Sequence, residues 1–468
     1  MKLKSDGHSM EYEAEQMVLL FFPNHDNITL KSSLSEKDGT TFVTTEATAH
    51  GETVTYTEKA ETKAFSKREL GNLIKRSAYF ALRPLSPLPA PWGILTGVRP
   101  AKLVRILMEE GNSEKEVRRI LKETYLAYDD KIDLAVKVAL EEGKHPRNPK
   151  DVCVYIGIPY CPTRCAYCSF ISGTGATTKK EEYVRLLLLE IQRTGEIIKD
   201  LGLSLRSIYI GGGTPTSLEA PLLRTLHEGI TKFLPVYSGM EFTTEAGRPD
   251  TITREKLQVL KAFGTNRISI NPQTLHDETL KRIGRRHTSA QFLSAFALAR
   301  EEGFTNVNTD LIAGLPGENF EMYRHSFDTV KSLAPESITV HTLYVKRASE
   351  IGQSGEDVSL YPQVSDMLAY TYREASAVGY RPYYMYRQKA TVGNLENVGY
   401  ALPGYDSFYN TVTMTDCANI FALGAGGVSR LLLPDKVERV FNFKHDDGYT
   451  REFAEVLRRK EEFYKIKA

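Results

Sequence analysis

The sequence predicts an α/β fold in which a central parallel sheet is flanked by an N-terminal and a C-terminal α+β domain. Between residues 151 and 346, short runs rich in β-branched residues alternate with longer runs of helical periodicity, which is typical of β-α units. Residues 145–150 read HPRNPK, and the two prolines interrupt any helix there. Beyond residue 346 the pattern becomes mixed and rich in tyrosine. We therefore expect three domains, formed by residues 1–150, 151–346 and 347–468.

The central sheet is predicted from six strand-like runs separated by runs with helical spacing. The expected strands cover residues 152–158, 207–210, 240–244, 267–271, 306–312 and 337–343. The expected helices cover residues 180–200, 221–233, 254–263, 289–302 and 321–333. This count favours an open or partial (β/α)6 barrel, which places functional loops at the carboxyl ends of its strands.

The N-terminal region reads as a hairpin followed by helices. Residues 41–57 alternate between apolar and polar around a turn at His50-Gly51-Glu52, and residues 66–142 have the spacing of successive amphipathic helices. The polar start of the chain lacks the apolar middle of a signal peptide, so we expect a cytoplasmic protein.

Composition limits the classes of partner. A hydrophobic content of 41% with 25% charged residues is typical of a soluble globular protein, and no apolar run reaches the roughly 20 residues of a membrane span. The formal net charge of +1 provides no field for nucleic acid or anionic lipid. We therefore expect a small-molecule partner, no nucleic acid and no membrane span.

The most distinctive motif is CPTRCAYC, which places Cys161, Cys165 and Cys168 on one loop directly after the first strand of the predicted sheet. Three thiolates hold three corners of a [4Fe-4S] cluster and leave the fourth iron open. The alternatives are a structural zinc, which takes four protein ligands, or buried cysteines without a ligand. Because no second Cys or His pair stands at zinc-finger spacing, the sequence favours an iron-sulfur cluster with an open position.

Polar and glycine-rich positions follow the later strands in turn. Residues 211–216 read GGGTPT, and glycines let backbone approach a ligand closely. Glu245, Gln273 and Asp310 stand at or within successive strand ends, and Arg285 follows Gln273 by 12 positions. Carboxylates accept hydrogen bonds from ribose hydroxyls and a guanidinium binds a carboxylate in a bidentate pair, so this set suits an amino-acid nucleoside.

The cysteine spacing resembles that of the radical S-adenosylmethionine (SAM) superfamily, in which SAM chelates the open iron and is reductively cleaved to a 5′-deoxyadenosyl radical. Over roughly residues 152–312 the pattern is similar to the oxygen-independent coproporphyrinogen III oxidases. The resemblance implies that no side chain acts as catalyst beyond the cluster and SAM. It also implies SAM contacts from nine positions, namely Tyr155, Tyr167, Gly212, Gly213, Thr214, Glu245, Gln273, Arg285 and Asp310.

The tyrosine-rich segment 379–389, GYRPYYMYRQK, and the cluster segment GIPYCPTRCAYCSF resemble the HemZ branch of this oxidase family. That branch implies oxidative decarboxylation of coproporphyrinogen III to protoporphyrinogen IX in anaerobic haem biosynthesis, with an unidentified electron donor and acceptor and up to two SAM per turnover. Cationic and aromatic side chains suit a tetrapyrrole with propionates, although tyrosines at this density also form cores or domain interfaces. The substrate candidates are Arg381, Tyr384, Tyr386, Arg387 and Lys389.

Two other functions stay open at this point. A sister branch keeps the cluster motif but acts as a haem-binding chaperone, and other radical SAM enzymes modify tetrapyrroles differently. The chaperone branch ends a C-terminal motif in Tyr-Trp, whereas the single tryptophan here is Trp92. Phe170 and Gly157 stand where well-known bacterial oxidases carry Cys and His, which separates this chain from those enzymes as well.

Overall fold

The computed structural model describes residues 1–22, 27–168, 173–344, 361–388 and 394–466. The fold divides into two compact units, the first made of residues 1–140 and 385–396, the second of residues 141–384 and 397–468. The division into three domains at residues 150 and 346 stays a prediction. The two units differ from it because residues 397–468 fall in the same unit as the predicted barrel.

The first unit contains a four-stranded sheet with two helices against it. The strands, in the order β1-β2-β3-β4, are β1 (Lys2–Asp6), β2 (Thr29–Lys37), β3 (Thr40–Ala49) and β4 (Glu52–Glu61). The helices of the unit are α1 (Glu11–Phe21), α2 (Lys67–Leu82), α3 (Pro100–Glu109), α4 (Glu114–Glu123) and α5 (Asp129–Glu142), with a short 3-10 turn η1 (Arg83–Leu85) after α2. β3 and β4 pair antiparallel with Ala49 opposite Glu52, which confirms the hairpin predicted around His50.

Alternation along β3 explains how the first sheet packs. Val43 and Ala47 are buried on one face, whereas the hydroxyls of Thr44 and Thr57 meet at 2.9 Å on the other face. Ser66 begins α2 through a capping box with Glu69, so the backbone amides of these two residues are both hydrogen-bonded. Every helix within the described residues is either too short or too polar to span a lipid bilayer.

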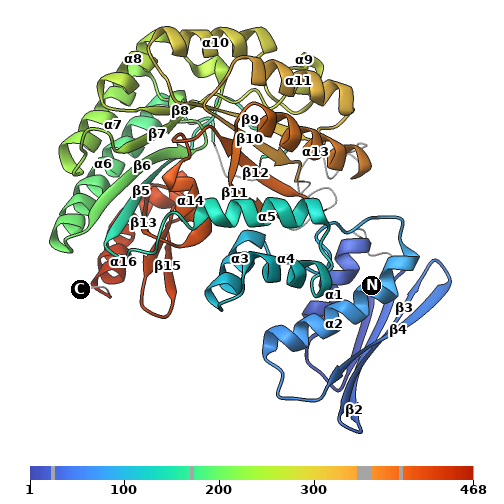
Figure 1. Ribbon diagram of the computed structural model, residues 1–468. Helices are drawn as coiled ribbons and strands as arrows, with labels where there is room; N and C mark the ends of the chain where they lie inside the picture. Colours follow the sequence, from blue (N-terminus) through green and yellow to red (C-terminus); the bar gives the residue numbers. More distant parts are fainter. Residues whose placement is uncertain (23–26, 169–172, 345–360, 389–393, 467–468) are drawn as a thin grey trace. The chain divides into compact units, whose positions relative to one another are not determined.

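The second unit contains the predicted parallel sheet, and the α/β fold class is confirmed. Six strands pair in parallel in chain order, namely β5 (Asp151–Ile158), β6 (Ser204–Gly212), β7 (Glu241–Glu245), β8 (Arg267–Ser269), β9 (Val307–Ala313) and β10 (Ser337–Thr342). The helices that follow them lie along the outer side of the curved sheet (Figure 1), namely α6 (Thr177–Asp200), α7 (Ala220–Phe233), α8 (Arg254–Ala262), α10 (Ser289–Glu301) and α11 (Phe320–Ser332). All five helices were expected from the sequence to within a few residues.

Additional strands and helices complete this unit. β13 (Asn419–Leu423) pairs in parallel with β5, and β14 (Val428–Leu432) and β15 (Val437–Phe441) continue antiparallel beyond it. β12 (Glu396–Ala401) pairs antiparallel with β10, and β11 (Arg381–Arg387) precedes it in the chain. The remaining elements are α9 (Asp277–Arg282), α13 (Tyr361–Ala377), α14 (Phe408–Thr415), α15 (Asp446–Arg451), α16 (Phe453–Lys465) and the 3-10 turns η2 (Pro215–Ser217) and η3 (Pro249–Thr251).

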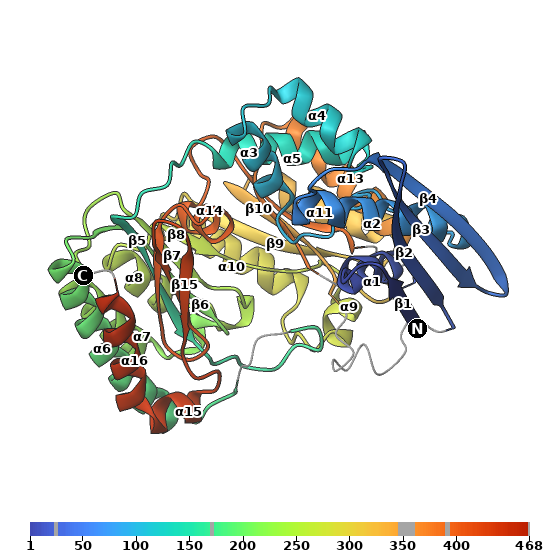
Figure 2. The same ribbon diagram turned by 90° about the horizontal axis from the view of Figure 1, so that it is seen from below.

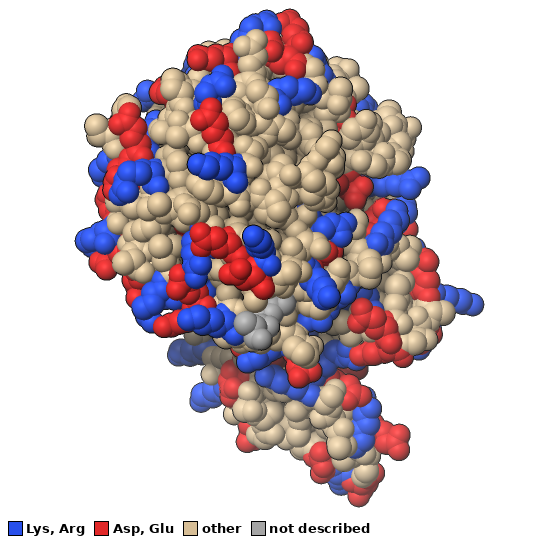
Figure 3. All heavy atoms as spheres, turned by 90° about the vertical axis from the view of Figure 1, so that its left-hand side faces the viewer, with Lys and Arg blue, Asp and Glu red and all other residues tan. Residues whose placement is uncertain are grey.

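The parallel strands are buried on both faces, which is why they read as nearly continuous apolar runs. In β5, Val152, Val154 and Ile156 are fully buried. Side-chain caps set several helix starts, since Thr288 begins α10 and Asn319 begins α11. Charged side chains of both signs are interspersed on the face shown in Figure 3, in keeping with the formal net charge of +1.

Candidate functional site

The cysteine loop follows β5 and is held by backbone hydrogen bonds. Cys161, Cys165 and Cys168 are half-buried and free of disulfides. The Cys161 amide donates to the Gly173 carbonyl at 3.0 Å, and the Cys168 amide donates to the Cys165 carbonyl at 3.1 Å. Main-chain hydrogen bonds therefore help to shape the loop that carries the three cysteines.

A buried guanidinium that the sequence reasoning missed braces this loop. Arg248, 3% exposed, binds Asp250 through two hydrogen bonds of 2.9 Å and donates to the Thr163 hydroxyl at 3.0 Å. Its Nη1 lies 3.9 Å from Cys165 Sγ. In the sequence, Arg248 could have been noticed because it stands three residues after Glu245, near the carboxyl end of β7.

The glycine segment after β6 comes close to the cysteine loop. A Cβ added at Gly213 would lie 2.6 Å from the Tyr160 carbonyl oxygen and 3.0 Å from Cys161 Sγ, so a larger residue does not fit. The Thr214 hydroxyl lies 3.4 Å from the same sulfur. Gly212 has φ +106°, a conformation that L side chains rarely adopt. This close backbone approach fits a cofactor held between the cluster and the glycine segment.

The three cysteines do not form a site for a single ion. Within the described residues, no group of three His, Cys, Asp or Glu side chains is arranged to hold one metal ion. Cysteines that bind a cubane cluster each coordinate a different iron atom, so their sulfurs need not converge on one point. The assignment of these three cysteines to a cluster stays a prediction.

Glu245 ends β7 next to the glycine segment. Tyr209 OH donates a hydrogen bond of 2.6 Å to its carboxylate. Burial raises the pKa of Glu245 to about 7, the Tyr209 hydrogen bond opposes that rise, and the charge of Asp310 adds to it. Half-buried Tyr155, Tyr209 and Tyr409 stack beside it, with the Tyr209 and Tyr409 ring centroids 4.5 Å apart. This carboxylate is consequently poised to change its protonation near neutral pH.

Asp310 in β9 has the opposite electrostatic environment. The side-chain amides of Asn271 and Asn308 donate to its carboxylate at 2.8 and 2.7 Å, and His341 Nε2 lies 3.6 Å from it. Burial opposes ionisation, but the hydrogen bonds and the histidine outweigh it and hold the pKa of Asp310 below its usual range. Asp310 is therefore an ionised acceptor across the pH range in which Glu245 titrates.

Gln273 and Arg285 are hydrogen-bonded to main-chain carbonyl groups in or just after neighbouring strands. Gln273 has φ +68°, its amide donates to the Asp310 carbonyl at 3.0 Å, and its Oε1 is buried without a hydrogen-bond partner among the described residues. Arg285 donates to the Asn271 carbonyl at 3.1 Å and to the Gly247 carbonyl at 2.7 Å. The Arg285 side chain and the Gln273 main chain are thus fixed at the carboxyl ends of the strands, and Gln273 Oε1 remains as an acceptor for a ligand.

Tyr167 joins the cysteine loop to this edge. It packs against an apolar cluster that includes Leu280, Ile283 and Ile312, and burial raises its pKa despite the nearby charge of Arg285. The structure therefore brings the nine expected SAM positions to one edge of one sheet, beside the three cysteines. Their roles in binding SAM stay predictions.

The substrate candidates are not brought together in the same way. Tyr384 is buried in the second unit, where its hydroxyl lies 3.5 Å from the Thr339 hydroxyl, and a Cβ added at Gly399 would lie 1.8 Å from its ring. Arg381 is exposed at the start of β11, and Tyr386 is half-buried. Lys389 lies outside the described residues. Tyr384 thus has the surroundings of a core residue, the alternative that the sequence left open.

Arg387 belongs to the first unit and is bound by neighbours there. Its Nε donates to the Asn394 carbonyl at 3.0 Å, its Nη1 donates to the Leu95 carbonyl, and its guanidinium lies 5.4 Å from the centroid of the Trp92 ring. Burial lowers its pKa to about 10. The contacts of Arg387 are therefore those of a packing residue, and its role toward a substrate stays a prediction.

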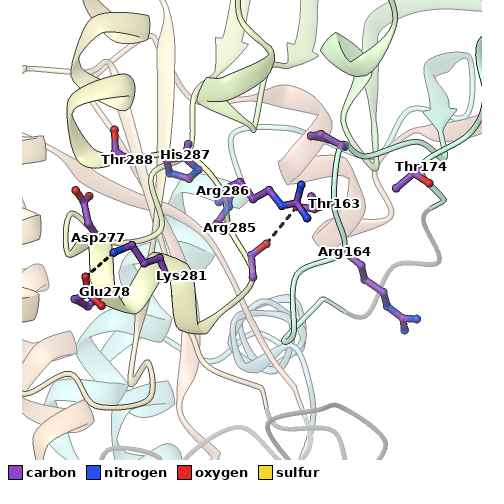
Figure 4. Close-up of a pocket in the computed structure, with 12 residues that line it drawn as sticks. Thr163, Arg164, Thr174, Asp277, Glu278, Lys281, Arg285, Arg286, His287 and Thr288 are labelled. Atoms are coloured by element: carbon purple, nitrogen blue, oxygen red, sulfur yellow. Dashed lines mark hydrogen bonds and ion pairs between the residues drawn. The ribbon is translucent and has the colours of Figure 1, made fainter.

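A cavity of about 1160 Å³ adjoins the cysteine loop (Figure 4). Pro162, Thr163 and Arg164 of the loop form one side, and Lys281 and the segment from residue 284 to residue 288 form the other. Of the nine expected SAM positions, Arg285 alone lines it.

Comparisons with known proteins identify the family of this chain. The Radical SAM superfamily model matches residues 155–330, which extend from β5 into α11. The oxygen-independent coproporphyrinogen-III oxidase-like protein HemZ of Bacillus subtilis (strain 168) is 40% identical over 407 residues, which cover 85% of this chain and 81% of that protein. The chain belongs to the HemZ family of radical SAM proteins. Membership implies a [4Fe-4S] cluster and SAM as cofactors.

Two further relatives are informative for this HemZ-family chain. The heme chaperone HemW of Bacillus subtilis (strain 168) is 40% identical over 193 residues, which cover 41% of this chain and 50% of that protein. The solved structure of coproporphyrinogen III oxidase (HemN) from Escherichia coli, a radical SAM enzyme, superimposes with a TM-score of 0.55 at 22% identity, covering 68% of this chain and 72% of that one. The likeness to HemN supports the fold alone.

Proposed function

We propose that this protein is an oxygen-independent coproporphyrinogen III oxidase, which converts two propionate groups of coproporphyrinogen III to vinyl groups and forms protoporphyrinogen IX. The observation that carries the proposal is the approach of Gly213 to Cys161 beside a row of polar strand ends, in a chain 40% identical to a protein named as oxidase-like. We expect the reaction to take place in the cytoplasm, as part of anaerobic haem biosynthesis.

The residues divide into three tasks in this proposal. Cys161, Cys165 and Cys168 would hold the iron-sulfur cluster through their thiolates, with fewer protein ligands than a closed four-cysteine site. When bound, the cluster and SAM together supply a one-electron reductive cleavage that delivers a 5′-deoxyadenosyl radical for hydrogen abstraction. Glu245 and Asp310 provide acceptors for hydroxyl or ammonium groups of SAM, and the other strand-end positions hold its remaining parts.

The stoichiometry of the reaction determines what else is required. Each propionate loses a hydrogen atom from its β-carbon, carbon dioxide and one further electron as it becomes a vinyl group. An electron acceptor is therefore needed in addition to the donor that reduces the cluster. No side-chain base is needed for the hydrogen transfer, so the chain's contribution is to position the reactants and exclude water. Two propionates require two SAM cleavages for each protoporphyrinogen IX.

The test is SAM cleavage by anaerobically reconstituted protein in the presence of a reductant. Adding coproporphyrinogen III is expected to accelerate release of 5′-deoxyadenosine, with two molecules released per protoporphyrinogen IX detected by mass spectrometry. Cys165→Ala is expected to abolish both the visible absorbance of the cluster and the cleavage, while Cys153→Ala, in the buried core of β5, retains both. Cleavage that ignores the tetrapyrrole, with no vinyl product, would refute the assignment.

A haem-binding chaperone is the second candidate, because the match to a heme chaperone reaches 40% identity over 193 residues. A chaperone binds haem stoichiometrically and yields no decarboxylated product. Haem titration followed by absorbance, run beside the product assay, separates the two functions. A different modified tetrapyrrole in the product assay would instead point to another radical SAM reaction.

A further inference from the structure

The cavity in Figure 4 reaches the cysteine loop from the solvent. Pro162, Thr163 and Arg164, which form one side of it, lie between two of the three cysteines in the sequence. The Thr163 hydroxyl donates to the Gly284 carbonyl at 3.2 Å, which joins that side to the other. Gly284 has φ +74°, and a Cβ there would lie 3.1 Å from the Arg164 carbonyl oxygen. The cysteine loop therefore forms one wall of the cavity and is hydrogen-bonded to the opposite wall.

The cavity has a lining distinct from that of the expected SAM site. Glu245, Gln273 and Asp310 are absent from its lining, and so is the glycine segment. Arg285 contributes to it, but its terminal nitrogens donate to the Asn271 and Gly247 carbonyls at the strand ends. Most residues expected to bind SAM therefore lie outside the cavity. The cavity is a second route by which a partner could approach the cysteine loop.

The lining is basic. Arg164, Lys281 and Arg286 are exposed, and in Figure 4 Arg164 extends from the cysteine loop on one side while Lys281 lies on the other. Two carboxylates also line it, namely Glu278, which pairs with Lys281 at 2.7 Å, and Asp277, which accepts from the Ser289 amide at 2.8 Å. The four cationic side chains of the lining outnumber its two carboxylates, so its formal charge is positive. Arginines are also frequent in protein interfaces.

We infer that this basic cavity is the docking site of an acidic electron-donor protein, a low-potential one-electron carrier that gives its electron to the cluster. The inference rests on the proposed function, which requires reduction of the cluster. Electron transfer slows steeply with distance, and the cavity lets a partner contact the loop that carries the three thiolates. Complementary charge increases the rate of such an encounter by tenfold or more and makes it sensitive to salt.

The experiment measures anaerobic reduction of the oxidised cluster by stopped-flow absorbance with two reductants. One is dithionite, a small molecule, and the other is a reduced acidic flavodoxin. The variant is Lys281→Glu with Arg286→Glu, since both side chains are exposed and neither is assigned to cluster or SAM. The matched control is Lys199→Glu with Arg324→Glu, two exposed cations that do not line the cavity, of which Arg324 has an acidic partner three positions away, as Lys281 does.

With flavodoxin, the Lys281→Glu, Arg286→Glu variant is expected to be reduced at least about tenfold more slowly than the parent and to lose its salt dependence. Its reduction by dithionite stays within about twofold, and the control pair matches the parent with both reductants. A parental rate with flavodoxin overturns the inference, and so does equal slowing with both reductants, which indicates a change in the cluster itself. Weakened SAM binding with a parental flavodoxin rate overturns it in favour of a small anion. No tetrapyrrole is present, so failure of the proposed substrate leaves this result intact.

Discussion

Two carboxylates of the second unit, Glu190 in α6 and Glu245 at the end of β7, have contrasting surroundings. Glu190 is 0% exposed and accepts hydrogen bonds from the Gly424 amide at 2.8 Å and from Tyr449 OH at 2.6 Å. It also accepts a hydrogen bond from Asn442 Nδ2 at 3.2 Å and forms an ion pair with buried Lys460. α16, which carries that lysine, packs beside α6 (Figure 2).

Glu245 is half-buried, and the hydrogen bonds that it accepts come from Tyr209 OH and the Gly212 backbone. The difference shows that the hydrogen bonds a carboxylate already accepts from the protein separate a structural role from a ligand-binding one. A carboxylate whose lone pairs are filled by the protein ties elements together, as Glu190 ties α6 to the C-terminal helices. A carboxylate at a strand end that still has free acceptor sites can bind a ligand, and burial raises its pKa because few groups stabilise its charge.

The largest effect is expected from Glu190→Gln. Removing the charge leaves Lys460 buried without its counter-ion, which costs about 3–5 kcal/mol of unfolding free energy. Urea unfolding followed by circular dichroism measures the change. Glu182→Gln, which breaks an exposed pair with Arg185 on the same helix, is the control and is expected to leave the midpoint unchanged. Equal urea midpoints for the two variants would contradict the stabilising role of Glu190.

The next effect is a pH dependence that belongs to Glu245. Its pKa is about 7 in the folded protein against an ordinary value of 4.5, so between these values the folded state keeps a proton that the unfolded state has released. The free energy of unfolding therefore falls as pH rises through this window, by about 3 kcal/mol from this group. Unfolding without added SAM at pH 5 and pH 8 is expected to show a smaller pH difference in Glu245→Gln than in the parent. Identical differences would contradict the raised pKa.

The smallest effect is expected on the affinity for SAM. Glu245→Gln keeps the shape of the side chain but loses a charged acceptor, so binding of SAM to the reconstituted protein is expected to weaken about tenfold, or about 1.4 kcal/mol. Equilibrium dialysis with SAM measures the change. Glu190→Gln, studied where it remains folded, is expected to bind SAM as the parent does. If the two variants lose affinity equally, the distinction between the two carboxylates fails.

Sequence patterns predicted the sheet well because each pattern is local. The expected strand 240–244 corresponds to β7, and the polar residue that follows it, Glu245, lies where the carboxyl end of a parallel strand was expected. Contacts between distant residues were beyond such reasoning. Arg248 reaches Thr163 across 85 positions, and Lys460 reaches Glu190 across 270. Neither pair has a spacing that periodicity or motif length detects.

The tyrosine-rich segment shows the same limit. Its alternating cations and aromatic rings suggested one substrate surface, yet Tyr384 and Arg387 fall in different compact units. Tyr384 packs on Gly399, and Arg387 is bound by carbonyl groups and by Trp92. Composition indicates that a side chain suits a ligand, whereas the neighbours that compete for it are set by the fold.

By itself, the sequence determined the family, the α/β class and the chemistry of the cysteine loop, because those depend on spacings within a few residues. Only the tertiary structure decided which carboxylates are saturated, that Arg248 braces the cluster loop, and that a basic cavity opens beside it. The physical reason is that hydrogen-bond satisfaction, burial and electrostatic environment are properties of groups brought together from distant parts of the chain.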